Sequence, residues 1–319
     1  MAFAKIPQVP RSQELMRSSL SAARPKSMRK KPYDDALSAS RKFERERLFA
    51  FREVVISRLA KLVTSFPSVD ALSEFYRALL GTHFSLDDYK RVLGRVDSTK
   101  QVVSTLTKKY KGRVEAAGDV DEVKKAMSEY FGRVASVLTR LEESFIWLEE
   151  IRRLLEDLPV VKEMFTVCIA GFPNVGKSTL FQKITGSAAE VNSYAFTTKS
   201  LNVGSAKLEH YKVQFIDTPG TLNREYTNAI EDQAALALKY VADLIIFVYD
   251  PTEQYSEELQ RGLRASLSDL RAPILEFVSK LDIASDEQAE RFVSEKTVSD
   301  VDLLREEILA CAKKYYTQL

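Results

Sequence analysis

One stretch of the chain decides the fold: Gly171-Phe172-Pro173-Asn174-Val175-Gly176-Lys177-Ser178. It fits the phosphate-loop pattern G-x-x-x-x-G-K-[ST]. Residues 165–170 before it are typical of a short strand buried on both faces, and the residues from Thr179 onward are typical of a helix. In that context the loop can present backbone N–H groups to a polyphosphate, and the helix N-terminus adds positive potential. The alternative is a chance glycine-rich turn, which the correct flanks and the motifs downstream make improbable.

Three side chains of this stretch have expected roles. Lys177 can reach the terminal phosphates, and the Ser178 hydroxyl can ligate Mg²⁺. Asn174 has two interpretations: it holds a K⁺ ion beside the phosphates, or it only stabilises the loop through hydrogen bonds. The nucleotide-binding set here comprises Gly171 to Ser178 together with Thr179.

Two further stretches carry groups that can sense a γ-phosphate. Asp217-Thr218-Pro219-Gly220 follows the strand 213–216, so Asp217 can hold Mg²⁺ through water and the Gly220 N–H can bond the γ-phosphate. Phe196-Thr197-Thr198 lies between the two loops, and a threonine hydroxyl there can complete the Mg²⁺ shell when triphosphate is bound.

A third stretch indicates guanine. Ser279-Lys280-Leu281-Asp282 follows the strand 274–278 in the place of an N-K-x-D motif. Asp282 can accept hydrogen bonds from guanine N1 and N2, which adenine cannot donate, and Lys280 would lie along the base plane. Ser279 stands where Asn is usual, which predicts a shortened or lost polar contact and a lower affinity. Ser294 and Glu295, after an expected strand at 291–294, form a weak match to the segment that presents a backbone N–H to the base.

The residue after Gly220 is Thr221, whereas small signalling GTPases place a water-orienting Gln there. Slow intrinsic hydrolysis is therefore expected, with the water positioned by backbone groups, by Thr197-Thr198 or by a partner. If Asn174 holds K⁺, turnover should be faster in K⁺ than in Na⁺.

Composition bounds the class of protein. The 319 residues suggest about two domains, and a net charge of +2 hides an uneven distribution. Residues 1–60 carry 14 Lys/Arg against 6 Asp/Glu, so the remainder is net acidic. A basic front end favours a polyanionic partner such as RNA, and a solvated basic tail is the equally weighted alternative. Cys168 and Cys311 are expected to be buried apolar residues in a reducing compartment.

The periodicity predicts an all-α antiparallel bundle followed by an α/β domain. Residues 1–33 are expected to form a basic, loosely ordered arm, 34–160 the bundle, and 163–319 the nucleotide-binding domain. Bundle helices are expected at 34–64, 70–80 and 85–110, with a break bracketed by Gly112 and Gly118. Residues 119–158 should then form one unbroken rod of roughly 60 Å.

The α/β domain should hold a mostly parallel six-stranded sheet. Its strands are expected at 165–170, 200–208, 210–217, 243–250, 273–279 and 291–294, and its helices at 177–185, 225–240, 254–268 and 300–316. A single helical turn is expected between Asp282 and Phe292. No apolar run is long enough to span a bilayer and no signal peptide is evident, so a cytoplasmic protein without membrane contact is expected.

These motifs together resemble the nucleolar GTP-binding protein 1 family, a branch of the Obg-related GTPases. The resemblance rests on the phosphate loop, on Asp217-Thr-Pro-Gly220, on the fairly specific Tyr194-Ala-Phe-Thr-Thr-Lys-Ser200, and on Arg-Lys-Phe-Glu-Arg at 41–45. It covers about residues 30–319. Because the chain ends after its last α/β helix, without the long extension of eukaryotic members, it resembles a compact archaeal-type member.

The resemblance implies GTP and Mg²⁺ as ligands, GTP hydrolysis as the activity and large-ribosomal-subunit assembly with rRNA contact as the role. It places Mg²⁺ on Ser178 and Thr198, and guanine on Lys280 and Asp282; the candidate catalytic groups are Lys177, Thr198 and Gly220. Ribosomal proteins and rRNA would be the partners of a monomer. The candidate RNA contacts are basic residues of the arm and first long helix, namely Arg24, Lys26, Arg29, Lys30, Lys31, Arg41 and Arg45. Two other hypotheses remain open: a binding module whose nucleotide is structural and rarely turned over, and a regulatory switch without RNA contact.

Overall fold

The structure is a computed structural model that describes residues 6–23, 35–158, 160–186, 192–193, 201–218, 229–252 and 254–318. The chain divides into two compact units. The helical unit holds residues 3–71 together with 84–156, and the α/β unit is built from residues 72–83 together with the chain from 157 onward.

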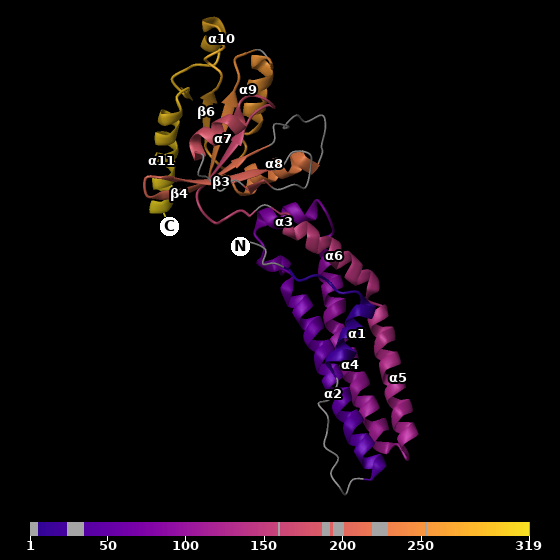
Figure 1. Cartoon of the computed structure of the whole chain (residues 1–319). Helices are drawn as coiled ribbons and strands as arrows, with labels where there is room; N and C mark the ends of the chain where they lie inside the picture. Colours follow the sequence, from indigo (N-terminus) through magenta and orange to yellow (C-terminus); the bar gives the residue numbers. More distant parts are fainter. Residues whose placement is uncertain are drawn as a thin grey trace. The chain divides into compact units, whose positions relative to one another are not determined.

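The helical unit is an antiparallel bundle, as expected (Figure 1). Helix α2 packs on both α4 and α5, and a three-residue connection joins α4 to α5. Its elements are α1 (Ser12–Ala22), α2 (Ala36–Ser65), the 3₁₀ turn η1 (Val69–Ala71), α4 (Leu86–Ala116), α5 (Val120–Thr139) and α6 (Glu142–Glu156). The expected caps are present, because Ser85 accepts from the Asp88 N–H and Asp119 accepts from the Glu122 N–H.

Aromatic side chains fill the core of the bundle. Phe51 of α2 is fully buried and meets Tyr130 and Phe131 of α5 edge-on, with ring centroids 5.9 and 5.1 Å apart. The Tyr130 hydroxyl lies 3.0 Å from the hydroxyl of Thr107 on α4, so this buried phenol has a polar partner. Burial raises the pKa of Tyr130.

The prediction of one rod over 119–158 is wrong, because the chain breaks between α5 and α6 at Arg140 and Leu141. The Arg140 carbonyl accepts from Arg95 of α4, at 3.2 Å, in place of a helical N–H. The apolar stripe nevertheless continues through Leu138, Leu141 and Phe145, all buried. A two-residue break that preserves the stripe leaves no trace in the periodicity. The break expected between Gly112 and Gly118 is present at its Gly118 end, where the chain turns at 117–119, whereas Gly112 itself lies inside α4.

The segment expected to be a loosely ordered arm contains an anchored helix. Residues 12–22 form α1, which packs on α2 and α5 with Leu15 buried. Two acidic side chains of α6 bind the chain where it enters α1. Glu149 accepts from the Val9 N–H at 3.1 Å, and Glu142 accepts from the Ser12 N–H at 2.8 Å. The basic residues at 24–31 lie outside the described part of the chain.

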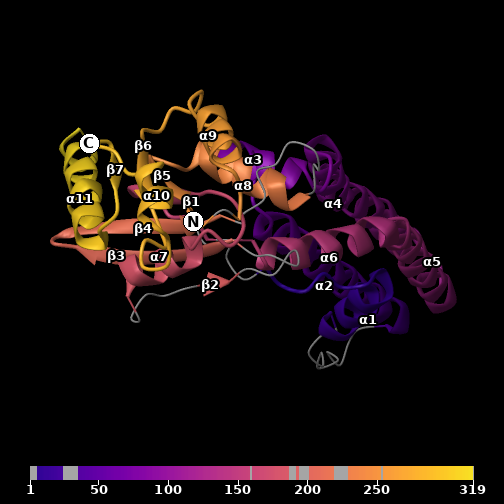
Figure 2. The same ribbon diagram turned by 90° about the horizontal axis from the view of Figure 1, so that it is seen from above.

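The α/β unit is built on a mostly parallel sheet (Figure 2). Over the described residues the sheet order is β2-β3-β4-β1-β5-β6-β7, with β2–β3 and β3–β4 antiparallel and the remaining pairs parallel. Its strands are β1 (Thr166–Ala170), β2 (Asn192–Ser193), β3 (Asn202–Leu208), β4 (Tyr211–Asp217), β5 (Leu244–Tyr249), β6 (Ile274–Val278) and β7 (Thr297–Val298). Every residue of β1 and β5 is buried, as their continuous apolar sequences predict.

Helices lie on both faces of this sheet (Figure 2). They are α7 (Lys177–Thr185), α8 (Ala229–Tyr240), α9 (Glu257–Ser266), the single turn α10 (Asp286–Glu290) and α11 (Val301–Thr317). The short helix α3 (Glu74–Gly81) departs from the expected layout, because it packs on α8 of this unit. Tyr76 of α3 accepts from the Val161 N–H at 2.8 Å, which ties α3 to the segment that enters β1.

The expected edge strand at 291–294 is wrong. The strand in that place is β7, which pairs in parallel with β6 through Glu276 opposite Thr297 and Phe277 opposite Val298. Phe292 is buried because its ring packs 5.3 Å from the ring of Tyr249, so its apolar character reflects core packing after α10.

Candidate functional site

The functional stretches of the sequence meet at one edge of the sheet. Strands β4, β1, β5, β6 and β7 run parallel, so their carboxyl ends lie at the same edge. Such an edge is where open α/β sheets bind ligands. The residues that end or directly follow these strands are Asp217, Gly171, Asp250, Ser279 and Ser299.

Two glycines give the phosphate loop its shape. Gly171 has φ 147°, and a Cβ there would lie 2.7 Å from the Val248 carbonyl oxygen, so the loop leaves β1 against the backbone of β5. Gly176 has φ 96° and caps the N-terminus of α7 in the left-handed conformation. Asn174 is also left-handed, with φ 62°, and its side chain is exposed. The loop therefore has the strand, turn and helix context that its sequence predicts.

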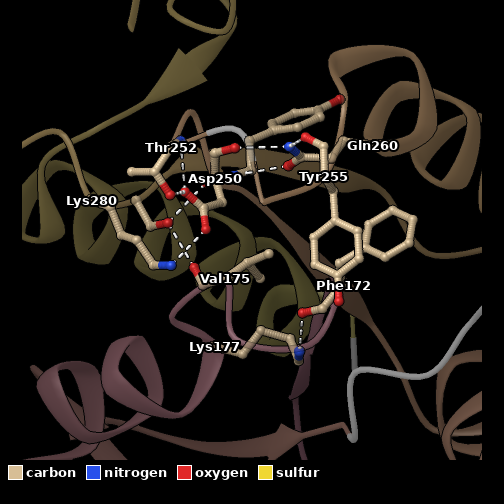
Figure 3. Close-up of polar contacts among 10 residues, drawn as sticks. Phe172, Val175, Lys177, Asp250, Thr252, Tyr255, Gln260 and Lys280 are labelled. Atoms are coloured by element: carbon tan, nitrogen blue, oxygen red, sulfur yellow. Dashed lines mark hydrogen bonds and ion pairs between the residues drawn. The ribbon is translucent and has the colours of Figure 1, made fainter. Parts of the chain in front are cut away.

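Lys177 opens α7 and is almost fully buried, with 6% of its surface exposed. Its ammonium donates to the Phe172 carbonyl oxygen at 2.7 Å (Figure 3). The Phe172 ring in turn stacks on Tyr255, with ring centroids 4.4 Å apart and planes at 23°. The loop backbone that holds Lys177 is thereby supported from the segment before α9.

Ser178 and Asp217 form a polar pair at the start of α7. The Ser178 hydroxyl donates to Asp217 Oδ2 at 2.6 Å, and the Asn202 amide donates to the same oxygen at 3.2 Å. Asp217 Oδ1 is buried and has no hydrogen-bond partner within the described residues. A hydroxyl beside a carboxylate with a free oxygen is an oxygen donor set that suits Mg²⁺ and its waters, so the expected metal residues fit the ion. Thr218 anchors the exit of β4, since its hydroxyl donates to the Ile169 carbonyl at 2.7 Å.

Ser279 does more than its sequence predicts. Its hydroxyl lies 2.6 Å from the Val175 carbonyl oxygen and 2.9 Å from that of Tyr249. One short side chain thus lies between the phosphate loop and the end of β5, and its single proton is best placed for the nearer Val175 carbonyl; the expected lower nucleotide affinity stays a prediction. Gly176 lies beside Ser279, and a Cβ there would sit 3.5 Å from the Ser279 Cβ, an ordinary van der Waals contact, so its φ of 96° and not a lack of space favours glycine.

Lys280 is held by a residue that the sequence reasoning missed. Its ammonium lies 2.6 Å from Asp250 Oδ2, and the Asp250 side chain is fully buried (Figure 3). Thr252 donates to Asp250 Oδ1 through its N–H at 2.9 Å and its hydroxyl at 2.6 Å. Burial alone would raise the pKa of Asp250, but the hydrogen bonds from Lys280 and Thr252 hold that pKa below its usual value.

The backbone of Asp250 is fixed by Gln260 of α9, which is also fully buried. The Gln260 side-chain oxygen accepts from the Asp250 N–H, and its amide donates to the Asp250 carbonyl, both at 2.8 Å. The same amide donates to the Tyr255 carbonyl at 2.9 Å. Asp250 could have been found from the sequence, because it follows a buried strand as Gly171 and Ser279 do; Gln260, Tyr255 and Asn202 carry no such signal.

The remaining candidates for guanine binding lie at opposite edges of the sheet. Asp282 is exposed at the carboxyl edge, two residues after Lys280. Ser294 and Glu295 lie before β7, at its amino end, where Ser294 forms a closed turn with Thr297. The residues that follow β7 are Ser299 and Asp300, and Asp300 caps α11 by accepting from the Asp302 and Leu303 N–H groups. Ser299 and Asp300 therefore lie at the carboxyl end of β7, and Ser294 and Glu295 lie at its amino end.

Several predicted residues cannot be placed. Those outside the described part of the chain are Phe196, Thr197, Thr198, Pro219, Gly220, Arg24, Lys26, Arg29, Lys30 and Lys31. Of the two described RNA candidates, Arg41 is half-buried and donates to the Ala117 carbonyl at the end of α4. Arg45 is exposed and lies 3.8 Å from Glu115. Arg41 thus caps a helix of its own bundle.

The strand-loop-helix around Lys177, the Ser178–Asp217 pair and the base-side stretch at 279–282 occupy one edge of a mostly parallel sheet. Together they define a P-loop GTPase domain. The model for the 50S ribosome-binding GTPase domain matches residues 166–280, and the model for the NOG1 N-terminal helical domain matches residues 3–162. The chain belongs to the nucleolar GTP-binding protein 1 family.

Individual relatives span most of the chain. It is 36% identical over 293 residues to an uncharacterized protein of Methanocaldococcus jannaschii, covering 90% of this chain and 82% of that one. It is 33% identical over 298 residues to nucleolar GTP-binding protein 1 of Drosophila melanogaster, covering 89% of this chain and 45% of the fly protein, so it spans less than half of that relative. The G domain of the FeoB iron transporter of T. maritima is 27% identical, covers 47% of this chain and 99% of that chain, and has a TM-score of 0.39.

Within the described residues, no helix combines the length and the apolar character that crossing a membrane requires.

Proposed function

We propose that the protein is a GTP-binding GTP hydrolase that acts as a nucleotide-switched assembly factor for the large ribosomal subunit. The observation that carries the nucleotide part is the meeting of Lys177, the Ser178–Asp217 pair and the 279–282 stretch at one sheet edge. The ribosomal part rests on the family, whose GTPase model is described as 50S ribosome-binding.

The phosphate end of the nucleotide would lie over the loop at 171–178. Lys177 would exchange its bond to the Phe172 carbonyl for contacts to the terminal phosphates. Ser178 and Asp217 would hold Mg²⁺, which neutralises charge that develops on the phosphates. Thr198 and Gly220 would complete the γ-phosphate contacts, and Lys177 with these two groups would stabilise the transition state.

The base end would lie over the loops that follow β6 and β7. Asp282 would accept hydrogen bonds from the guanine edge, and Lys280 would lie along the base plane. A backbone N–H of the segment Ser299–Asp300 would face the base, because this segment follows β7 at the carboxyl edge. Ser279 would fix the position of the phosphate loop relative to the loop that binds the base, through its hydrogen bond to the Val175 carbonyl.

Hydrolysis would be slow without help, because Thr221 stands where small GTPases carry Gln. K⁺ held with the aid of Asn174 could supply positive charge beside the phosphates, and exposure of the Asn174 side chain on the loop supports this role. The protein would act as a monomer in the cytoplasm, and contact with rRNA or ribosomal proteins would come through the basic segment before α2 and the bundle.

The test begins with calorimetric titration of GTP, GDP and ATP into the full chain with Mg²⁺. Micromolar or tighter binding of guanine nucleotides and no binding of ATP is expected. Lys177→Ala should abolish tight binding, while Lys183→Ala, an exposed lysine on the same helix, should not. Co-sedimentation with large-subunit particles, stronger with a non-hydrolysable GTP analogue than with GDP, tests the ribosomal part.

Two outcomes would redirect the proposal. Tight GTP binding with negligible turnover in K⁺ and in the presence of particles would favour a structural nucleotide. Particle binding that ignores the nucleotide would remove the switch. Equal binding of ATP, or no nucleotide binding by folded protein, would overturn the assignment of the site.

A further inference from the structure

We propose that Asp250 is a positioning residue of the guanine site, which acts by holding Lys280 in place before the nucleotide arrives. This inference rests on the proposed GTP binding and adds a residue outside the loops that touch the ligand. Asp250 directly follows β5, the strand between those that lead to the phosphate loop and to the 279–282 stretch.

The two oxygens of the Asp250 carboxylate bind different partners. Oδ1 accepts both donors of Thr252, and Oδ2 lies 2.6 Å from the Lys280 ammonium. The side chain is fully buried, whereas that of Lys280 is 28% exposed. The Asp250 carboxylate is therefore fixed inside the protein, and Lys280 is the partner of the pair that is partly exposed at the carboxyl edge of the sheet.

The anchor is itself held from α9. The Gln260 side chain pairs with both the N–H and the carbonyl of Asp250, so its backbone cannot shift without breaking two hydrogen bonds at 2.8 Å. Lys280 has φ 54°, a left-handed conformation that is unfavourable for a non-glycine residue. The ion pair offsets this cost and selects one direction for the lysine side chain.

Stability alone does not account for such a pair. Buried ion pairs contribute little beyond what packed apolar side chains provide, because both charges lose hydration. A free lysine side chain, in contrast, loses rotamer entropy when a ligand orders it. Fixing Lys280 beforehand removes that loss from nucleotide binding.

The isosteric substitution Asp250→Asn tests the proposal. The remaining oxygen can still accept from Thr252, but the new amide donor faces the Lys280 ammonium and removes their contact. The dissociation constants of GTP and GDP should both rise about tenfold, by the same factor, because the base and ribose are common to both. In steady-state hydrolysis KM should rise while kcat stays unchanged.

Two controls separate positioning from general damage. Glu257→Gln removes an exposed carboxylate on α9 that pairs with Arg261, and should leave both nucleotide affinities unchanged. In a Lys280→Met background, Asp250→Asn should cause no further loss of affinity, because the lysine through which it acts is gone.

The outcomes are decisive. Unchanged GTP and GDP affinity in folded Asp250→Asn, or an equal additional loss in the Lys280→Met background, would overturn the inference while leaving GTP binding intact. If the wild-type chain binds no guanine nucleotide, the proposed function fails and this inference with it. If Asp250→Asn does not fold, Thr252→Val is the second variant, because it replaces only the hydroxyl by a methyl group. It should lower GTP affinity severalfold in the wild-type background and leave it unchanged in the Lys280→Met background. Any other pattern refutes the role.

Discussion

Acidification is expected to loosen the amino-terminal segment from the helical bundle, through one carboxylate. Glu149 of α6 accepts hydrogen bonds from Arg152 at 2.8 and 2.9 Å, from the Val9 N–H at 3.1 Å and from Arg153 at 3.3 Å. The Arg152 contacts lower the pKa of Glu149 to about 2 against an ordinary value of 4.5, although burial opposes the shift. Its side chain is only 16% exposed, so solvent screens these contacts weakly.

The size of the effect follows from proton linkage. Because the folded-state pKa is lowered, the stabilisation is fully present above pH 4.5 and is lost as the pH falls toward about 2. The lowered pKa of Glu149 corresponds to at most about 3 kcal/mol in the free energy of unfolding, since one pKa unit is worth about 1.4 kcal/mol. Glu149→Gln removes the charge at every pH, so at pH 7 it should cost about 2–3 kcal/mol.

Hydrogen exchange at the Val9 amide is the direct assay, since that N–H is the donor to Glu149. Glu149→Gln should speed its exchange about fivefold at pH 7, because the Val9 N–H would then donate to a neutral amide oxygen in place of a carboxylate, a loss of about 1 kcal/mol. Glu156→Gln is the matched control, because Glu156 pairs with Arg152 and has no hydrogen bond or ion pair to the described residues 6–23. The reasoning is refuted if the two variants exchange alike, or if chemical unfolding of Glu149→Gln keeps the wild-type dependence on pH between 4.5 and 2.

Three further substitutions test the site and the core. Gly171→Ala should destabilise the α/β unit by at least about 2 kcal/mol and abolish nucleotide binding, because its Cβ would meet the Val248 carbonyl; a normal melting temperature would contradict the loop geometry. Ser279→Ala should lower the affinity for GTP about tenfold, because the buried Val175 carbonyl loses its hydroxyl donor at a cost of about 1–2 kcal/mol. Unchanged affinity in calorimetry would show that this hydrogen bond does not support nucleotide binding. Phe51→Ala should cost about 3–5 kcal/mol of bundle stability in urea unfolding, and a loss below about 1 kcal/mol would show that this ring is not at the core.

The fold could be predicted wherever a pattern is continuous and local. The buried strands around Cys168 and Ile246 follow from runs of apolar residues, and α4 begins at a serine cap that the sequence displays. The break at Arg140 could not be predicted, because the donor that satisfies its carbonyl is Arg95, 45 residues away in the chain. Tertiary contacts of that kind leave no local pattern.

The same division holds for the site. Lys177, Ser178 and Asp217 come together as their motifs predict, since each motif is tied to the end of a strand. The hydrogen bond from Ser279 to the Val175 carbonyl was not predictable, because a family pattern says which residue is usual and not what a shorter side chain reaches. The strand expected at 291–294 rests on the apolar Phe292, which is buried as part of the core; the strand is β7 at 297–298, so the proposed base contact lies about five residues further along the chain than Ser294.

The register of the antiparallel pair β3–β4 constrains one position of the chain. Asn202 and Asp217 stand opposite each other in β3 and β4 and share a hydrogen bond at 3.2 Å. In chain order, Tyr194-Ala-Phe-Thr-Thr-Lys-Ser200 ends just before the first, and Asp217-Thr-Pro-Gly220 starts at the second. Position 202 therefore bears a double constraint, because any side chain there must suit the start of a strand and also pair with the Asp217 carboxylate.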